Sequence, residues 1–324
     1  MKIQSKRGKR SRLTVSVVLC LLLVLCAGCG QKPAEKSPAA AENFCVIEDD
    51  AGRSVPLVKK PERIAVTSAS FLEPLHAVGG SVVGRPDSKT KMPDYAKDAA
   101  SIGQVYQIDA EKLLSCQPDL VIINKGMNEK LLEVLDSNKI PAIVINMKSY
   151  EDVRREISNF AQITGEKEKG EQLLSGMEQK IRETVGKIPK ERRRVAILHS
   201  TAQGLSVQLD GSIAGNITKL LGWENVASGM TPMEKNPDAA PYSMETLVEQ
   251  NPEIIFVTSM GKIEDIKANM EQMIAENPAW QTIPAIQEKR LFYLPQELFL
   301  LSPGIHYPEA VELMAGLIYP EAVK

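Results

Sequence analysis

The chain of 324 residues contains three histidines, and their spacing argues against one kind of site. His76, His199 and His306 lie far apart, whereas zinc ligands in proteins usually recur at short, fixed spacings. We therefore do not expect a site for a bare Zn²⁺ or Mn²⁺ ion. His76 falls within an apparent helix over residues 72–78 and is expected to be structural. His306 is expected to cap or pack against a terminal helix.

Side chains able to hold a ligand follow several of the expected strands. In an open α/β sheet, the loops at the carboxyl ends of the strands line the ligand crevice. This rule selects residues 68–71, 103–106, 124–127, 199–203, 241–242 and 258–260, with 297–299 as a further edge. The side chains expected to line the cleft are Ser68, Ser70, Phe71, Tyr106, Lys125, His199, Tyr242 and Met260. They include His, Met and Tyr, which are residue types that ligate haem iron.

Motifs of common enzyme classes are not found in the sequence. Residues 79–84 depart from the dinucleotide-binding pattern G-x-G-x-x-G because Ser81 replaces the second glycine. G-x-S-x-G, P-loop and H-E-x-x-H motifs do not occur either. An enzyme, which a nicotinamide requirement or turnover would reveal, is therefore the less favoured class. A purely structural surface protein, which would bind no ligand, is a third alternative.

The helices and strands that must position these loops are predicted by a residue pattern that occurs twice in the chain. Residues 111–123 and 245–257 each contain a Glu, an apolar pair, a Pro, an acidic residue and an apolar run, at the same spacings. Each copy predicts the end of a helix, a turn and a buried strand, because Pro cannot continue a helix. The apolar runs do not alternate, as is typical of parallel strands that are covered on both faces.

Other segments extend this repeat. Residues 63–68 match 194–200, and residues 75–84 match 220–227, as strands and helices in the same order. Each half therefore follows the order of an α/β fold. Two similar lobes are expected, with a cleft between them.

Two helices are expected between the repeats. Ser149 opens the first, which ends near Gly165, and residues 166–186 form a longer one with apolar residues at helical spacing. The longer helix would measure about 30 Å and could join the lobes as a stiff strut. Packing against one lobe alone is the alternative. The expected divisions are an N-terminal lobe over residues 44–164, an interlobe helix over 165–188 and a C-terminal lobe over 189–324.

The N-terminus indicates export. Six basic residues within residues 1–12 precede an apolar stretch over 13–25, which is too short to span a bilayer, so residues 1–28 are expected to be a signal peptide. Ala-Gly before Cys29 resembles the bacterial lipoprotein cleavage box, although Cys26 stands where Leu or Val is usual. An ordinary secretory signal is the alternative. Residues 29–43 read as a flexible tether that begins at the lipidated Cys29.

Removal of the signal peptide leaves 33 basic and 41 acidic residues, a net charge near −8. This charge gives no support to nucleic-acid binding. Cys45 and Cys116 remain in apolar contexts, where they could pair or stay as buried thiols.

From about Phe44 to Pro320 the chain resembles the iron-complex and cobalamin substrate-binding proteins of bacterial ABC importers. The motifs that carry the resemblance are a hairpin over 44–58 and the segments 61–64, 117–122, 222–226, 280–295 and 302–304. The resemblance implies two Rossmann-like lobes joined by a single long helix, the class III architecture. It also implies an extracytoplasmic monomer without catalytic cofactor, lipid-anchored to the cell membrane. Such a protein delivers a small metal chelate to a permease homodimer with its ATPase.

The resemblance gives the repeated glutamates a role. In the family, one exposed acidic residue on each lobe docks onto arginines of the permease, and Glu111 and Glu245 occupy these places. Carboxylates at these positions would form charge-assisted pairs with a two-fold partner. As acids in the first turn of a helix, they would also be favoured by the helix dipole alone.

The chain looks most like the haem-binding branch, in which one lobe supplies Met and the other His. Met260 stands where that branch has its His, and Glu73 stands where it has its Met. The possible axial ligands of haem iron are Met260, His199, Tyr106 and Tyr242. Haem is favoured over a ferric siderophore, because a catecholate siderophore would need a cluster of arginines in the cleft and Arg85 is the only obvious candidate in these loops. It is also favoured over cobalamin, because the two tryptophans lie in apparent scaffold motifs.

Overall fold

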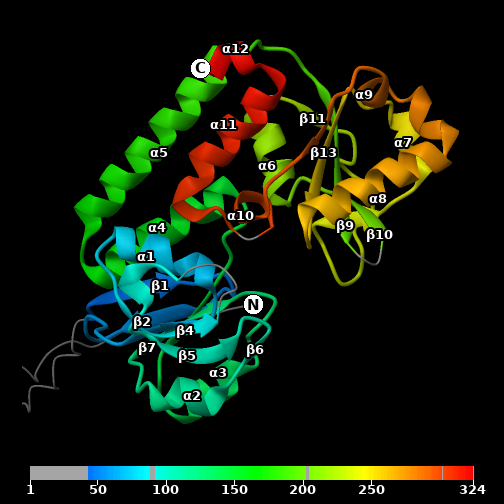
Figure 1. The fold of residues 1–324 in the computed structure, drawn as a ribbon. Coiled ribbons are helices and arrows are strands. Elements are labelled where there is room, and N and C mark those ends of the chain that lie inside the picture. Colours follow the sequence, from blue (N-terminus) through cyan, green and yellow to red (C-terminus); the bar gives the residue numbers. More distant parts are fainter. Residues whose placement is uncertain (1–42, 88–91, 202–203, 301, 324) are drawn as a thin grey trace, which may run out of the picture. The chain divides into compact units, whose positions relative to one another are not determined.

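The computed structural model describes residues 43–87, 92–201, 204–300 and 302–323 (Figure 1). The expected signal peptide, the expected lipidation site Cys29 and residues 30–42 of the expected tether lie outside the described residues. Within the described ranges, the structure contains no helix with both the length and the apolar character needed to cross a membrane.

The first lobe is built on a sheet with the strand order β6-β5-β4-β3-β7-β8, in which only β6 is antiparallel to its neighbour. The strands are β3 (Ile64–Val66), β4 (Val82–Asp87), β5 (Ala100–Gln104), β6 (Gln107–Ile108), β7 (Leu120–Asn124) and β8 (Ala142–Ile145). Its helices are α1 (Leu72–Ala77), α2 (Ala110–Ser115) and α3 (Leu131–Ser137). Apolar residues of α2 and α3 pack on one face of this sheet, and those of α1 pack on the other.

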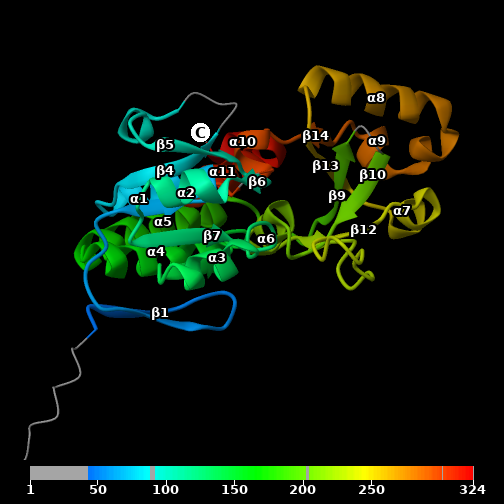
Figure 2. The same cartoon turned by 90° about the horizontal axis from the view of Figure 1, so that it is seen from below.

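The second lobe has the strand order β12-β10-β9-β13-β14, with β11 also paired to β9. The strands are β9 (Arg194–Thr201), β10 (Gly204–Gln208), β11 (Glu224–Asn225), β12 (Ala239–Pro241), β13 (Ile254–Ser259) and β14 (Leu291–Tyr293). The helices are α6 (Ile213–Leu220), α7 (Met244–Gln250), α8 (Ile263–Glu276), α9 (Pro284–Gln287) and α10 (Gln296–Phe299). Helices α7 and α8 lie on one side of the sheet and α6 on the other (Figure 2).

One strand of the second lobe, β10, departs from the expected α/β order. β10 runs antiparallel to both β9 and β12, so the second sheet carries an antiparallel edge that the repeat in the sequence did not predict. The central strands β9 and β13 and the edge strand β14 are parallel, as expected.

The helices expected between the lobes are confirmed. α4 (Tyr150–Thr164) begins with a capping box between Ser149 and Asp152, and it ends at Gly165, whose φ of 73° is left-handed. α5 (Lys167–Lys187) follows and is the single long helix that joins the two α/β lobes. The C-terminal helix α11 (Tyr307–Ile318) packs along α5 (Figure 1), and α12 (Pro320–Val323) ends the chain. One apolar core runs from the first sheet through α4, α5 and α11 to the second sheet.

The repeat is visible in the backbone where α2 and α7 end. The residue before each Pro, Gln117 in one copy and Asn251 in the other, is left-handed, with φ of 50° and 45°. This conformation is uncommon outside glycine, and with it the chain leaves the right-handed helical region before each Pro. The expected strands then follow as β7 and β13.

The repeat also extends to individual hydrogen bonds. Arg63 donates from Nη2 to the carbonyl of Cys116 at 2.6 Å, and Arg194 donates from Nη2 to the carbonyl of Gln250, which occupies the same position of the repeat. The acidic residue after each Pro accepts from the backbone N–H of the same arginine, Asp119 from Arg63 at 2.9 Å and Glu253 from Arg194 at 3.1 Å. Each arginine therefore ties the start of its strand, β3 or β9, to the end of the helix α2 or α7 in the same lobe.

The expected N-terminal hairpin is present as β1 (Cys45–Glu48) and β2 (Ser54–Leu57). Cys45 and Cys116 are both free thiols, in different apolar clusters, and burial raises the pKa of each. They are therefore packing residues here and do not form the disulfide that the sequence left open.

Candidate ligand-binding cleft

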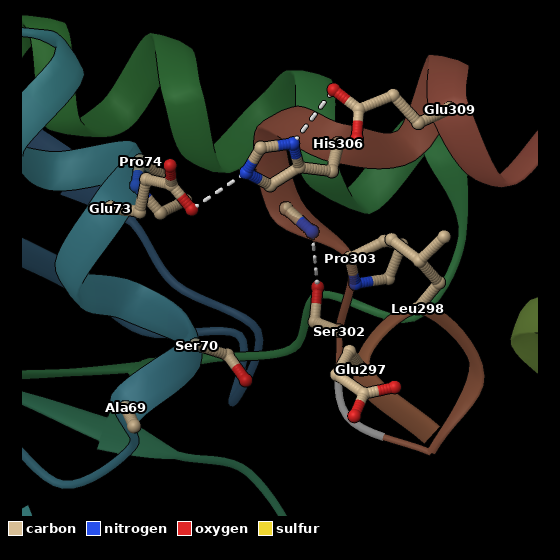
Figure 3. Close-up of a pocket in the computed structure, with 11 residues that line it drawn as sticks. Ala69, Ser70, Glu73, Pro74, Glu297, Leu298, Ser302, Pro303, His306 and Glu309 are labelled. Atoms are coloured by element: carbon tan, nitrogen blue, oxygen red, sulfur yellow. Dashed lines mark hydrogen bonds and ion pairs between the residues drawn. The ribbon is translucent and has the colours of Figure 1, made fainter. Parts of the chain in front are cut away.

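A cavity of about 370 Å³ lies where segments that follow β3 and β14 meet (Figure 3). We call it the cleft cavity. Its lining residues are Ala69, Ser70, Glu73 and Pro74 from the first segment, and Glu297, Leu298, Ser302, Pro303, Gly304, His306 and Glu309 from the second. Elements from both lobes therefore build one space whose volume is in the usual range for small-molecule sites.

His306 bridges the two segments that line the cleft cavity. Its Nε2 lies 2.9 Å from Glu73 Oε2 on α1, and its Nδ1 lies 2.9 Å from Glu309 Oε1 in the first turn of α11 (Figure 3). Burial of the ring opposes its charged form, but the hydrogen bonds and charges of Glu309 and Glu73 outweigh burial and raise the pKa of His306. Because carboxylates only accept hydrogen bonds, both ring nitrogens carry protons in this arrangement.

The position of His306 partly corrects the expectation from the sequence. It does lie at the start of the terminal helix α11, as expected. It also reaches Glu73, 233 residues earlier in the chain, and lines the cleft cavity, which the sequence did not indicate. The rule that strand-end loops line the crevice could have found this segment, because it follows β14.

The charge in the cleft cavity is mostly negative. Glu73, Glu297 and Glu309 line it, and His306 is the one lining side chain that can carry a positive charge. A field of this sign favours a neutral or cationic group over a polyanion. Within the described residues, no three His, Cys, Asp or Glu side chains are grouped so that they could hold a bare metal ion.

The loop after β3 places one of its three expected cleft residues in the cavity. Ser70 lines the cleft cavity, whereas Ser68 and Phe71 are buried beneath it. Ser68 Oγ accepts from the N–H of Ser70 at 3.3 Å and begins the short helix η1 (Ala69–Phe71), while Phe71 belongs to the core. The buried pair supports the backbone that carries Ser70.

Three other expected cleft residues follow parallel strands, as the rule requires, but do not line the cleft cavity. Tyr106 follows β5 and is 72% exposed, and Met260 follows β13 and is 59% exposed. Lys125 follows β7, and its Nζ donates to the backbone carbonyl of Asp50 at 2.6 Å. Tyr106 and Met260 are thus large, apolar and open to solvent at the ends of strands in different lobes.

The last two expected residues, His199 and Tyr242, are half-buried in the second lobe and already engaged. His199 Nδ1 lies 2.9 Å from Thr258 Oγ1, and burial lowers the pKa of this imidazole. The hydroxyl of Tyr242 donates to Met244 Sδ at 3.0 Å, and its ring stacks near Trp280. Burial raises the pKa of Tyr242, which disfavours the phenolate that binds ferric iron.

A second cavity, of about 470 Å³, continues the cleft towards Met260. It is lined by Gly261, Ile263, Lys267, Tyr293, Leu294, Pro295, Gln296 and Glu297, so it shares Glu297 with the cleft cavity. The side-chain amide of Gln296 donates to the carbonyl of Gly261, the residue after Met260. This bond ties the Met260 loop to α10.

Glu111 and Glu245 occupy the same position in the two copies of the repeat. Each is exposed in the first turn of its helix, α2 or α7. The helices begin with polar caps: Asp109 accepts from the N–H of Glu111 at 3.0 Å, and Ser243 accepts from that of Thr246 at 3.2 Å. The two carboxylates are accessible to a partner, and their docking role stays a prediction.

Two residues weighed in the sequence lie away from both cavities. His76 stacks on Tyr95, with ring centroids 4.0 Å apart, and is exposed on α1. Arg85 donates from Nε to the carbonyl of Ala96 at 3.1 Å, so its guanidinium is used within the first lobe.

Comparison with known proteins gives a family match. Residues 64–298 match the family model described as periplasmic binding protein. The chain is 23% identical over 312 residues to the putative ABC transporter substrate-binding lipoprotein YhfQ of Bacillus subtilis, covering 92% of this chain and 94% of the relative. It is 22% identical over 313 residues to the Fe(3+)-citrate-binding protein YfmC of the same species, covering 92% and 93%. The crystal structure of S. aureus IsdE complexed with haem superposes with a TM-score of 0.67 at 21% identity, covering 79% of this chain and 98% of that one.

Proposed function

Because the chain belongs to the periplasmic binding protein family, we propose that it captures an iron complex, with haem favoured, and delivers it to the permease of an ABC importer. The observation that carries this proposal is the cleft cavity, which is lined from both lobes. The family assigns the chain to binding proteins, which excludes the enzyme alternative.

The choice of haem is supported by the side chains at the strand ends. Haem needs apolar surface for its ring and a His, Met or Tyr ligand for its iron. Tyr106 and Met260 offer exposed apolar surface, and Met260 offers a thioether on the loop that α10 holds against the cleft. His199 and Tyr242 are weaker ligand candidates because both are half-buried and hydrogen-bonded within the second lobe.

A ferric siderophore, ferric citrate or cobalamin is the alternative ligand class. YfmC is named for ferric citrate, and ferric citrate complexes are anionic. Three carboxylates line the cleft cavity, and Lys125, which follows β7, is tied to Asp50. The charge of the cavity therefore disfavours a polyanionic chelate, and the two propionates of haem would have to lie outside it.

The proposed location is outside the cytoplasm, with the protein attached to the cell membrane through a lipid on Cys29. The support is the basic and apolar N-terminal sequence, together with the name of YhfQ as a lipoprotein. The proposed partner is a permease homodimer with its ATPase. Glu111 and Glu245 would meet it, one from each lobe, while the protein itself acts as a monomer.

An absorption titration with hemin tests the proposed ligand. The protein would lack residues 1–28 and carry Cys29→Ser, so that no terminal thiol can bind iron. A Soret band that saturates at one hemin per chain is the expected result, and it should shift in Met260→Ala if that thioether binds the iron. Binding of ferric citrate or cobalamin without binding of hemin would overturn the choice of haem and leave the family assignment intact.

A further inference from the structure

We propose that Lys148, Asn216 and Asp238 form an interlobe clasp that sets the spacing between the two lobes. Asn216 is its fixed point, and the ion pair of Lys148 with Asp238 is its releasable one. The clasp deepens the proposed function and rests on it, because the spacing of the lobes decides the width of the cleft and the separation of Glu111 and Glu245. The clasp residues act by position and have no need to touch the ligand.

Asn216 on α6 joins the starts of two helices to the second lobe. Its Oδ1 accepts from the backbone N–H of Tyr150 at 3.0 Å and from the hydroxyl of Tyr307 at 2.6 Å. Tyr150 is the first residue of α4 and Tyr307 the first of α11, which also packs on α6 (Figure 1). Burial raises the pKa of Tyr307, so its hydroxyl keeps the proton that it donates. One amide oxygen therefore holds α4, which follows the first sheet, against a helix of the second lobe.

The backbone that carries Asn216 is closely packed. Ser212 Oγ accepts from the N–H of Gly215 at 3.0 Å and donates to the carbonyl of Leu209 at 2.8 Å, which caps α6. A Cβ at Gly215 would lie 2.2 Å from the same carbonyl oxygen, so only glycine permits this approach. Asn216 thus keeps its place within the second lobe, as a fixed point requires.

Lys148 and Asp238 make a second contact between the lobes. Lys148 lies in the loop between β8 and α4, and its Nζ donates to Asp238 Oδ2. Asp238 is held in the second lobe, because its carbonyl accepts from the N–H of Leu209 at 2.8 Å. The side chain of Lys148 is 49% exposed and that of Asp238 is 22% exposed, so water and salt reach the pair. An exposed pair of this kind can open while both lobes stay folded.

A weak bond is sufficient because other contacts carry the fold. The apolar core that runs through α4, α5 and α11 holds the lobes together, and a small tilt about Asn216 is the freedom that remains. An equilibrium between two tilts shifts by as much as the contacts that differ between them. The ion pair exists only in the closer arrangement of the lobes. Its loss should therefore widen the range of spacings and leave the fold intact.

The first test measures the distance between the lobes without any ligand. Spin labels are attached to Glu133→Cys on α3 and Glu249→Cys on α7, which are both exposed positions. The protein lacks residues 1–28 and carries Cys29→Ser, Cys45→Ser and Cys116→Ala, so that only the labelled thiols remain. Double electron–electron resonance gives the distribution of distances, and circular dichroism reports that each variant is folded.

The ion pair is tested by removing one charge at a time. Lys148→Met and Asp238→Asn keep the approximate size of each side chain, and each should broaden the distribution, as should about 1 M NaCl with the unchanged protein. The charge swap that combines Lys148→Glu with Asp238→Lys should restore the narrow distribution, which a purely structural role would not explain. Lys97→Met is the matched control, because its ion pair with Asp94 lies within the first lobe.

The fixed point is tested separately. Asn216→Ala removes the acceptor of both Tyr150 and Tyr307 and should broaden the distribution more than loss of the ion pair does. Tyr307→Phe removes one of the two donors and should have a smaller effect. Asn216→Asp keeps an acceptor in the same place and should retain the narrow distribution.

Hemin release gives a functional readout in protein that keeps Cys45 and Cys116. Lys148→Met should release hemin about two- to fivefold faster than the unchanged protein, the ratio expected for loss of an exposed ion pair. Lys97→Met should release it at the unchanged rate. Equal release rates in all three proteins would deny the clasp an effect on the ligand.

The outcomes separate the clasp from the choice of ligand. Distance distributions that are the same in Lys148→Met, Asp238→Asn and Asn216→Ala as in the unchanged protein would overturn the clasp. Distributions that change as expected, in a protein that does not bind hemin, would keep the clasp and overturn the choice of haem.

Discussion

The carboxylate of Glu73 and the imidazole of His306 are joined at 2.9 Å, although 233 residues separate them in the sequence. Glu73 lies on α1 in the first lobe, and His306 precedes α11, which packs along the long helix α5. A single hydrogen bond thus connects the two segments that line the cleft cavity. A ligand that enters there must contact or displace this bond.

Replacement of Glu73 by Gln should lower the pKa of His306. The carboxylate raises this pKa by its charge and by its hydrogen bond, and an amide removes the charge. The imidazole resonances of the three histidines, followed by NMR as a function of pH, report the change. Glu264→Gln, on the exposed side of α8, is the control and should leave the pKa of His306 unchanged. A pKa that is the same with and without Glu73 would contradict the bond as described.

Glu156 on α4 should make the protein less stable as pH rises. This side chain is fully buried, and burial raises its pKa to about 7, against the smaller opposing effects of Asn159 and Arg155. Between about pH 4.5 and 7 the folded protein therefore holds a proton that the unfolded chain has lost, so the free energy of unfolding falls across this window. The expected fall is on the order of 3 kcal/mol.

Urea unfolding at pH 5 and pH 7.5 measures this effect. Glu156→Gln should flatten the dependence, because an amide carries no charge at either pH and can still accept from Arg155. If the stability of Glu156→Gln falls with pH as steeply as that of the unchanged protein, the titrating group is not Glu156.

The two repeated arginines should contribute similarly to stability. Arg63→Ala and Arg194→Ala each remove the donor that satisfies carbonyls at the end of α2 or α7, with an expected cost of about 1–3 kcal/mol. Arg192→Ala is the matched control, since its exposed pair with Glu224 should contribute less than about 1 kcal/mol. Thermal or urea unfolding compares the three variants. If all three lose the same free energy of unfolding, the repeated hydrogen bond does not stabilise the protein more than an exposed ion pair does.

Charge reversal at Glu111 or Glu245 should abolish import without changing the affinity for the ligand. Both carboxylates are exposed on first turns away from the residues that line the cavities. Uptake of the ligand by cells, with binding measured on the purified variants, distinguishes the two effects. Glu249→Lys, also exposed on α7, is the control and should support uptake. Loss of ligand affinity in Glu111→Lys or Glu245→Lys would argue against a docking role.

The sequence was most informative where a structure depends on neighbouring residues. The capping box at Ser149, the stop at Gly165 and the breaks before Pro118 and Pro252 are local, so α4, α5 and the repeated helix ends could be predicted. The parallel core strands also followed from apolar runs. The antiparallel β10 has no such signature, because its pairing is decided by tertiary contacts with β9 and β12.

The cleft was harder to predict because it depends on contacts between distant segments. Ser70, which the strand-end rule selected, lines the cleft cavity, and its contact with a ligand stays a prediction. His306 was assigned to the capping or packing of a terminal helix and Glu309 was not singled out, and only the fold shows that both Glu73 and Glu309 contact His306. His199 looked suitable by residue type and position, yet its Nδ1 lies 2.9 Å from Thr258 Oγ1 on the adjacent strand. Residue type and strand-end position do not reveal which side chains already have a partner.

The most direct test of the account is a crystal structure of the protein grown with hemin, with the iron located by its anomalous scattering. The account predicts one iron in the cleft that the two cavities form, with the hemin in contact with both lobes. Iron located outside this cleft, or hemin found only on the surface of the protein, would contradict the account.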